Sequence, residues 1–256
     1  MSTTRRVTAL SAGLLAVLGS AAPGLAVSAP AFGDAPLQLS SPAGHHQVAQ
    51  VGGVRNSSSS NWSGYAATGA TFTSVSASWV QPTGKCTSAT TYSSFWIGLD
   101  GDGSSTVEQT GSEVDCSGGS PQYYAWYEMY PAYPVNFSNT VKPGDHFTSS
   151  VTESGSHSFK LVLTDSTQGW TRTVTKTLSS ASLASAEVIA EAPSSSSGVL
   201  PLTNFGTASF TSATANGQPI GNYSPDQINM VSGSTTKATT SALSGGNAFT
   251  VTWKHS

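Results

Sequence analysis

Three stretches of the sequence concentrate side chains that could do chemistry. Residues 94–102 (SFWIGLDGD) run into 107–111 (VEQTG), and residues 123–131 (YYAWYEMYP) and 184–193 (ASAEVIAEAP) follow later in the chain. A carboxylate among aromatic residues is either exposed on a binding face or buried with a partner, because burying it alone costs several kcal/mol. From the residues alone, Glu128 and Glu187 could form the carboxylic pair of a glycoside hydrolase, with the aromatic side chains stacking on sugar rings.

The same residues also fit a protein that binds without catalysis. An open sheet that carries Trp and Tyr can hold a sugar or a peptide, as a lectin-like binding module does. The common hydrolase signatures are absent from the sequence: it contains no Gly-x-Ser-x-Gly, His-Glu-x-x-His, Asp-Thr-Gly or Asp-Ser-Gly motif and no phosphate loop. A serine nucleophile therefore has no local support, and we expect no metal and no cofactor.

Strands must position these side chains, because the sequence alternates between apolar and polar residues and lacks helical periodicity. Side chains on a strand alternate between its two faces. Glu187, Ile189 and Glu191 should therefore point together, and Trp96 should share a face with Asp100. A third set on one face comprises Tyr124, Trp126, Glu128 and Tyr130.

The length and spacing of these strands predict the fold class. Short alternating runs broken by Gly, Pro, Ser and Asn continue from Trp62 to Trp253 without an intervening helix. Such a pattern is typical of an all-β, antiparallel sandwich or barrel, and we favour a β-sandwich of two large sheets, jelly-roll-like or concanavalin-like, in a single domain.

The order of the motifs resembles one known family. NWSGY (61–65), WIGLDGD, EQTG, AWYEMYP, AEVIAE and PDQINMV (225–231) occur in the order typical of the glutamic peptidases, the eqolisins of peptidase family G1. The resemblance covers residues 61–254. It implies a sandwich of two antiparallel sheets with a substrate cleft, and an endopeptidase that cleaves polypeptide substrates at acidic pH.

The resemblance also implies roles for individual residues. The family's catalytic glutamine falls on Gln109 and its catalytic glutamate on Glu187, which would act as general base and then general acid. Gln109 would stabilise the oxyanion. The residues that would position the substrate or support this pair are Trp62, Trp96, Asp100, Trp126, Glu128 and Tyr130. Tyr124 departs from the family, which often has an acid at that position.

The N-terminal sequence predicts export. A basic pair, Arg5 and Arg6, precedes an apolar run and then small residues and prolines, so residues 1–31 read as a secretion signal peptide. Residues 32–60 would be a short propeptide or a disordered linker, and residues 61–256 the catalytic domain. In an exported chain, the only two cysteines, Cys86 and Cys116, are expected to form a disulfide, with two free thiols as the alternative.

Charge excludes one class of partner. Only 9% of residues are charged, the formal net charge is −3, and no cluster of Lys or Arg could follow a phosphate backbone. We therefore expect no nucleic-acid partner. The apolar run near the N-terminus is too short to span a bilayer, so we expect a secreted monomer with no membrane segment in its mature form.

Overall fold

The alternating sequence folds into strands arranged in two layers. The structure is a computed structural model that describes residues 46–51 and 54–256, with side chains from Arg55 onward. The expected signal peptide, residues 1–31, lies outside the described residues. All described residues fall in one unit, Ala35–Ser256.

The first sheet contains the three stretches that the sequence singles out. Its central strands pair antiparallel in the order β7–β6–β5–β12–β3–β17. The short strand β8 extends it beyond β7, and β2 and β1 extend it beyond β17. The bounds are β1 His46–Val51, β2 Val54–Ser59, β3 Trp62–Thr68, β5 Thr91–Leu99, β6 Val107–Ser117, β7 Ser120–Tyr130, β8 Val135–Asn136, β12 Ser185–Glu191 and β17 Asp226–Ser232.

The second sheet forms the other layer. Its strands pair antiparallel in the order β11–β10–β9–β4–β15–β19–β18. The bounds are β4 Ser74–Val80, β9 His146–Glu153, β10 Ser158–Asp165, β11 Trp170–Thr177, β15 Thr207–Ala215, β18 Thr235–Thr240 and β19 Phe249–Trp253. Short elements complete the fold: β13 Ser194–Ser195, β14 Gly198–Val199, β16 Gln218–Pro219 and a 3-10 turn, η1, Ile220–Tyr223.

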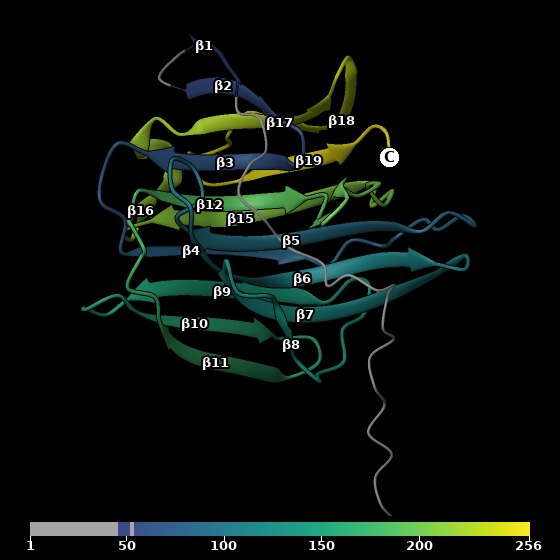
Figure 1. Cartoon of the computed structure of the whole chain (residues 1–256), viewed down its shortest axis with the longest axis horizontal. Helices are drawn as coiled ribbons and strands as arrows, with labels where there is room; N and C mark the ends of the chain where they lie inside the picture. The colour runs from purple at the N-terminus through teal and green to yellow at the C-terminus, as the bar shows by residue number, and fades with distance from the viewer. Residues whose placement is uncertain (1–45, 52–53) are drawn as a thin grey trace, which may run out of the picture. The chain divides into compact units, whose positions relative to one another are not determined.

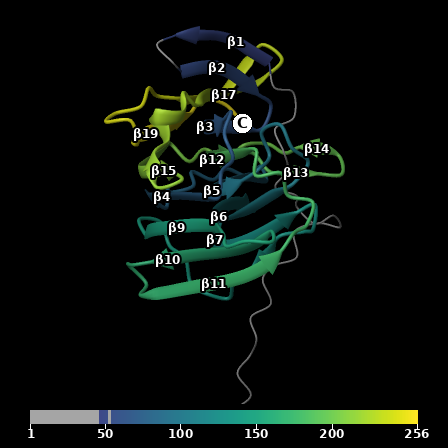
Figure 2. The same cartoon turned by 90° about the vertical axis from the view of Figure 1, so that its left-hand side faces the viewer.

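The two layers are joined along one side. Strand β17 pairs with β3 through its first residues and with β18 through its last, and β18 continues into the second sheet through β19. Strands β1 and β2 lie at one end of the array and β11 at the other (Figures 1 and 2). The predicted all-β sandwich is confirmed. One detail departs from a purely antiparallel sheet, because β2 runs parallel to β17.

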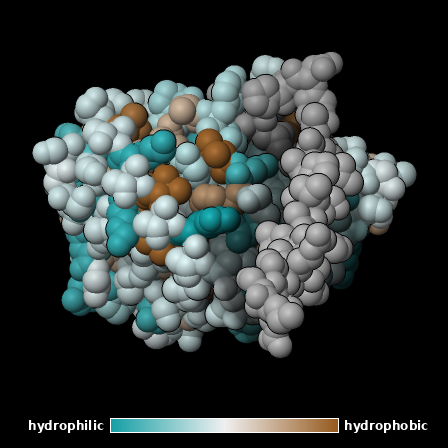
Figure 3. Space-filling view, turned by 90° about the horizontal axis from the view of Figure 1, so that it is seen from below, coloured by the Kyte–Doolittle hydropathy of each residue, from teal (hydrophilic) through white to brown (hydrophobic). Residues whose placement is uncertain are grey.

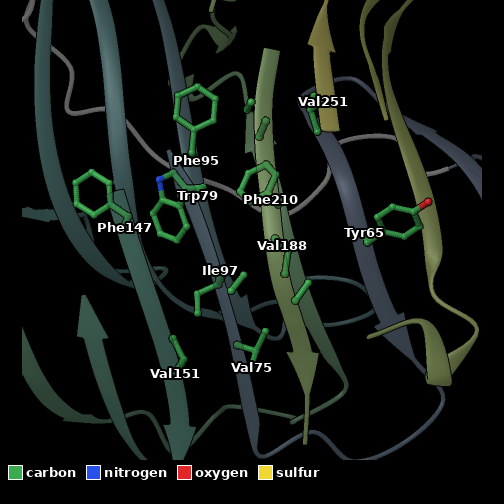
Figure 4. Close-up of a cluster of buried hydrophobic side chains, with 14 of the residues drawn as sticks. Tyr65, Val75, Trp79, Phe95, Ile97, Phe147, Val151, Val188, Phe210 and Val251 are labelled. Carbon is green, nitrogen blue, oxygen red and sulfur yellow. The ribbon is translucent and has the colours of Figure 1, made fainter. Parts of the chain in front are cut away.

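The core lies between the layers. Phe95 and Ile97 of β5 and Val188 of β12 point from the first sheet toward Trp79 and Phe147 of the second, as Figure 4 shows. Because alternate residues of the same strands point the other way, the outer face of the first sheet receives the remaining side chains. Most of the described surface in Figure 3 is pale, with few strongly hydrophilic residues, in keeping with the low charge of the chain.

The expected disulfide is present and ties β6 to the loop before β5. Cys86 and Cys116 are bonded across a separation of 30 residues. A loop of that length corresponds to about 4 kcal/mol of stabilisation, mainly because the bond restricts the unfolded chain. We expect a variant with both cysteines replaced by alanine to melt roughly 10 °C lower. Reduction of the wild-type protein should give a similar shift in a thermal unfolding experiment, and an unchanged melting temperature in both samples would contradict this role.

Within the part of the chain that the structure describes, no helix is long and apolar enough to cross a bilayer. The same described residues contain no cluster of three or more His, Cys, Asp or Glu side chains that could hold a metal ion.

Candidate active site

Strand register brings Gln109 and Glu187 to the same face of the first sheet. Gly98 of β5 lies opposite Gln109 of β6 on one side and opposite Glu187 of β12 on the other. Directly opposed residues share a face, so the two side chains flank a glycine on the outer face. Two strand spacings put their backbones roughly 10 Å apart. Glu128 of β7 lies opposite Gln109 and extends this row, which we call the catalytic row: Glu128, Gln109, Gly98 and Glu187.

The glycine in the catalytic row leaves room between the two functional groups. A Cβ atom on Gly98 would lie 3.1 Å from Gln109 Cβ and 3.1 Å from Trp96 Cζ3, tighter than ordinary contacts. Any larger residue at position 98 would therefore push against Gln109. Its side chain would also fill the space between Gln109 and Glu187. This arrangement explains why the site needs glycine at that position.

Gln109 is held by Glu128. The Nε2 atom of Gln109 donates a hydrogen bond of 2.6 Å to Glu128 Oε2, and both side chains are fully buried. This hydrogen bond holds the Gln109 amide group against the Glu128 carboxyl. The amide is thus oriented by its neighbour in the row.

Glu187 is buried beside a turn that supplies hydrogen bonds. The backbone N–H of Asp102 donates to Glu187 Oε1 at 3.4 Å and to Ser185 Oγ at 3.2 Å. Glu187 Oε2 has no hydrogen-bond partner among the described residues. Burial raises the pKa of Glu187 well above its usual value; a hydrogen bond from Ser185 opposes this shift, and the charges of Asp102 and Asp100 add to it. The environment of the carboxyl therefore favours its protonated form.

Asp100 takes a different place from its neighbours in the motif. It has a positive φ of 67° just after β5, so the strand alternation that would have placed it with Trp96 no longer applies. Its carboxylate accepts the backbone N–H groups of Ser182 and Leu183 at 2.9 Å and of Ala184 at 2.8 Å. Asp100 thus fixes the segment that leads into β12 and Glu187.

Aromatic residues surround the catalytic row. Trp62 and Trp96 pack edge to face with ring centroids 5.0 Å apart. Trp96 Nε1 also donates to Glu191 Oε2 at 2.8 Å. The outer face carries an apolar cluster made of Trp62, Ala66, Trp96, Val107, Trp126, Ile189 and Ile228, with Tyr124 and Tyr130 packed against it. Every expected site residue except Asp100 therefore lies on one face.

The sequence of this chain matches a known peptidase family. The sequence model described as the Peptidase A4 family matches residues 60–253, which is most of the chain. The chain belongs to the peptidase A4 family. Among family members, Aspergillopepsin-2 of Aspergillus niger is 28% identical over 209 residues, covering 70% of this chain and 73% of that protein. Scytalidopepsin B of Scytalidium lignicola is 34% identical over 122 residues, covering 47% of this chain and 45% of that protein.

Solved structures of the peptidase A4 family share the fold. Scytalido-glutamic peptidase, crystallised with a transition state analog inhibitor, aligns with a TM-score of 0.66 at 26% identity and covers 76% of this chain and 98% of its own. Aspergilloglutamic peptidase from Aspergillus niger aligns with a TM-score of 0.58 at 28% identity, covering 64% and 99%. The resemblance to the glutamic peptidases is confirmed, and this peptidase A4 member is a glutamic peptidase.

Sequence reasoning missed several polar groups of the peptidase A4 site. The Asp102 N–H and the Ser185 hydroxyl contact Glu187, but a backbone donor leaves no sequence signal. Glu113 and Asp115 lie on the same face as Gln109, as their register with β7 and β5 shows. Extending the alternation of β6 beyond Gly111 would have found both acids.

Proposed function

We propose that the chain is a secreted endopeptidase that hydrolyses peptide bonds of polypeptides at acidic pH, with Glu187 and Gln109 as its catalytic pair. The observation that carries this proposal is the catalytic row, in which a carboxyl and an amide flank a glycine on one face. Membership of the glutamic peptidase family favours peptide hydrolysis over the glycosidase and lectin alternatives.

The reaction needs only water and these two side chains. In its ionised form Glu187 takes a proton from a water molecule that attacks the scissile carbonyl carbon, and it then returns the proton to the leaving amine nitrogen. The Gln109 amide N–H donates to the oxyanion that develops on the carbonyl oxygen. No covalent intermediate forms.

The raised pKa of Glu187 sets a condition for this reaction. Burial is the largest cause of the shift, so water or substrate polar groups that reach the carboxyl would lower its pKa toward the usual range. The Asp102 N–H and Ser185 hydroxyl would then stabilise the ionised form. Catalysis thus requires that the site admit water together with substrate.

The remaining site residues have supporting roles in this proposal. Glu128 orients the Gln109 amide and Asp100 fixes the approach to β12. The buried Trp62, Trp96 and Trp126, with Tyr130 packed against them, would position the substrate chain once it enters the site.

We further propose that residues 1–31 are a signal peptide and that the enzyme acts as a secreted monomer on polypeptides. Residues 32–60 would be a short propeptide rather than a disordered linker, because β1 and β2 fall within this segment and β2 pairs with β17. The sequence features of the N-terminus support export. The family match, which begins at residue 60, supports the same boundary.

Digestion of denatured casein tests the proposed function. We expect cleavage in acid that fades toward neutrality, and we expect it to resist chelators and reagents that trap serine or cysteine nucleophiles. Mass spectrometry of the products should show internal cuts. Loss of activity with a chelator or a serine reagent, or cleavage only of a polysaccharide, would overturn the proposal.

A further inference from the structure

One buried carboxyl on the inner face of β6 takes no part in the proposed reaction. Glu108 precedes Gln109 on this strand, so its side chain points away from the catalytic row. The side chain has no exposed surface, and within the described part of the chain neither carboxyl oxygen completes a hydrogen bond of ordinary geometry. Buried polar groups are nearly always paired, so an acid in this position needs an explanation.

Asp100 is the acidic neighbour of Glu108. Strand register places Leu99, the last residue of β5, opposite Glu108, and Asp100 follows it in the chain. The positive φ of Asp100 turns its carboxylate away from the outer face and toward the N–H groups of residues 182–184. The carboxyls of Glu108 and Asp100 are close enough to share a proton, although not in the geometry of an ordinary hydrogen bond.

The other groups that approach Glu108 leave Asp100 as its electrostatic partner. Met129 of β7 lies opposite Glu108 on the other side, and the Thr106 hydroxyl comes from the turn before β6. Strands β9 and β10 contact β6 from the second sheet, and their titratable side chains are His146, Glu153, Lys160 and Asp165. Of the charges on the described residues, that of Asp100 is the one that acts on Glu108.

The shared proton lies on Glu108. Both oxygens of Asp100 accept backbone N–H groups, so neither is available to carry a proton. Burial, followed by the charge of Asp100, raises the pKa of Glu108 to about 9. In acid the pair therefore consists of a neutral Glu108 and an Asp100 that remains free to hold the backbone.

Asp100 connects this pair to the catalytic row. It binds residues 182–184 through its carboxylate, and its own N–H donates to the Ser185 carbonyl at 3.0 Å, two residues before Glu187. From the same turn, the Asp102 N–H donates to Ser185 Oγ and to Glu187 Oε1. The charge of Asp100 also raises the pKa of Glu187. A displacement of Asp100 would therefore move the groups that hold the Glu187 carboxyl.

We propose that Glu108 is a positioning residue that, while protonated, keeps Asp100 in place and through it holds Glu187 in the geometry of the reaction. This inference rests on the proposed peptidase function. Ionisation of Glu108 releases a proton to water and leaves two carboxylates side by side, which repel each other. The turns at residues 100–102 and 182–185 then open and admit water. Because a hydrated glutamate titrates near pH 4, this opening becomes easier as pH rises from about 4 to about 9.

Amide hydrogen exchange at Ser182, Leu183 and Ala184 tests the inference, because Asp100 binds these three N–H groups. Their protection factors are measured by NMR from about pH 5 to about pH 8, in low urea, to which local openings are insensitive. Each proton released on opening changes the opening equilibrium about tenfold per pH unit. Protection should therefore fall about tenfold more per pH unit in the wild type than in Glu108→Gln protein, whose amide cannot ionise.

The pH profile of kcat for one uncharged peptide gives a second readout. In Glu108→Gln protein, the pH at which kcat has fallen to half its maximum should lie about one unit or more above the wild-type value. KM should change little, because residue 108 lies on the inner face of the sheet, away from the substrate. A residue that only supports packing would change the melting temperature without moving the exchange slope or the kcat profile.

Glu153→Gln is the matched control, since the carboxyl of Glu153 binds the N–H groups of Gly155 and His157 in a turn of the second sheet. This variant should keep the wild-type exchange slope and kcat profile. Glu108→Leu, which also cannot ionise, replaces the glutamine variant if that protein does not fold.

Two results would overturn the positioning role while leaving the peptidase intact. One is an equal exchange slope in the wild type and the Glu108 variant, and the other is an unchanged kcat profile. Failure of the wild-type protein to cleave any peptide would instead overturn the proposed function. The exchange slopes would then still decide whether Glu108 holds the two turns, because that measurement needs no substrate.

Discussion

Glu187→Gln protein is expected to fold normally and to lose proteolytic activity, with kcat lower by about 10²- to 10⁴-fold. Glutamine has nearly the shape of a protonated glutamate, and burial raises the pKa of Glu187 and so favours that neutral form, which the substitution preserves. It removes the group that accepts the proton from water and returns it to the amine. The measurement is kcat for one peptide at the acidic optimum, alongside the melting temperature of each protein.

A second variant, at Gln109, separates the role of this residue from that of Glu187. Gln109→Met keeps the size of the side chain but removes the oxyanion donor, and we expect kcat to fall by about 10²- to 10³-fold. Combining Gln109→Met with Glu187→Gln should cost less than the product of the two single losses, because both groups act in one step. Wild-type kcat in either single variant would show that the catalytic row does not carry the reaction.

The faces of individual strands could be read from the sequence. Alternation places Glu187, Ile189 and Glu191 together, and register with β5 and β3 confirms that they share the outer face of β12. It fails for Asp100, because a positive φ ends the regular strand at that residue. The period of a strand predicts its face only while the backbone stays extended.

Relations between strands could not be read in the same way. Nothing in the alternation states that Gly98 lies between Gln109 and Glu187, because register depends on how whole strands pair. The parallel pairing of β2 with β17 and the continuation of the first sheet into the second through β18 are equally non-local. The order of motifs predicted the pair Gln109 and Glu187 before any geometry was known, but the geometry was needed to show that these two residues share a face.

The fold itself should be most stable in acid. Burial raises the pKa of Glu108 to about 9 and that of Asp115 to about 7, and it raises the pKa values of Glu113 and Glu187 well above the usual range. The unfolded carboxyls titrate near pH 4, so between about pH 4 and pH 9 the folded protein binds more protons than the unfolded one. The free energy of unfolding must therefore decrease as pH rises through that window. We expect the melting temperature to fall steadily from about pH 4 to about pH 8.

Glu108 offers a direct test of this cause. It has no exposed surface, neither of its carboxyl oxygens has a hydrogen-bond partner of ordinary geometry among the described residues, and the charge of Asp100 adds to the effect of burial. Glutamine at this position stays neutral at every pH. Glu108→Gln protein should therefore match the wild type near pH 4 and melt roughly 10 °C higher near pH 8, where keeping Glu108 protonated in the fold costs on the order of several kcal/mol relative to the ionised group of the unfolded chain. A wild-type protein that is more stable at pH 7 than at pH 4, or a variant that gains nothing at pH 8, would show that buried carboxyls do not set the acid preference of the fold.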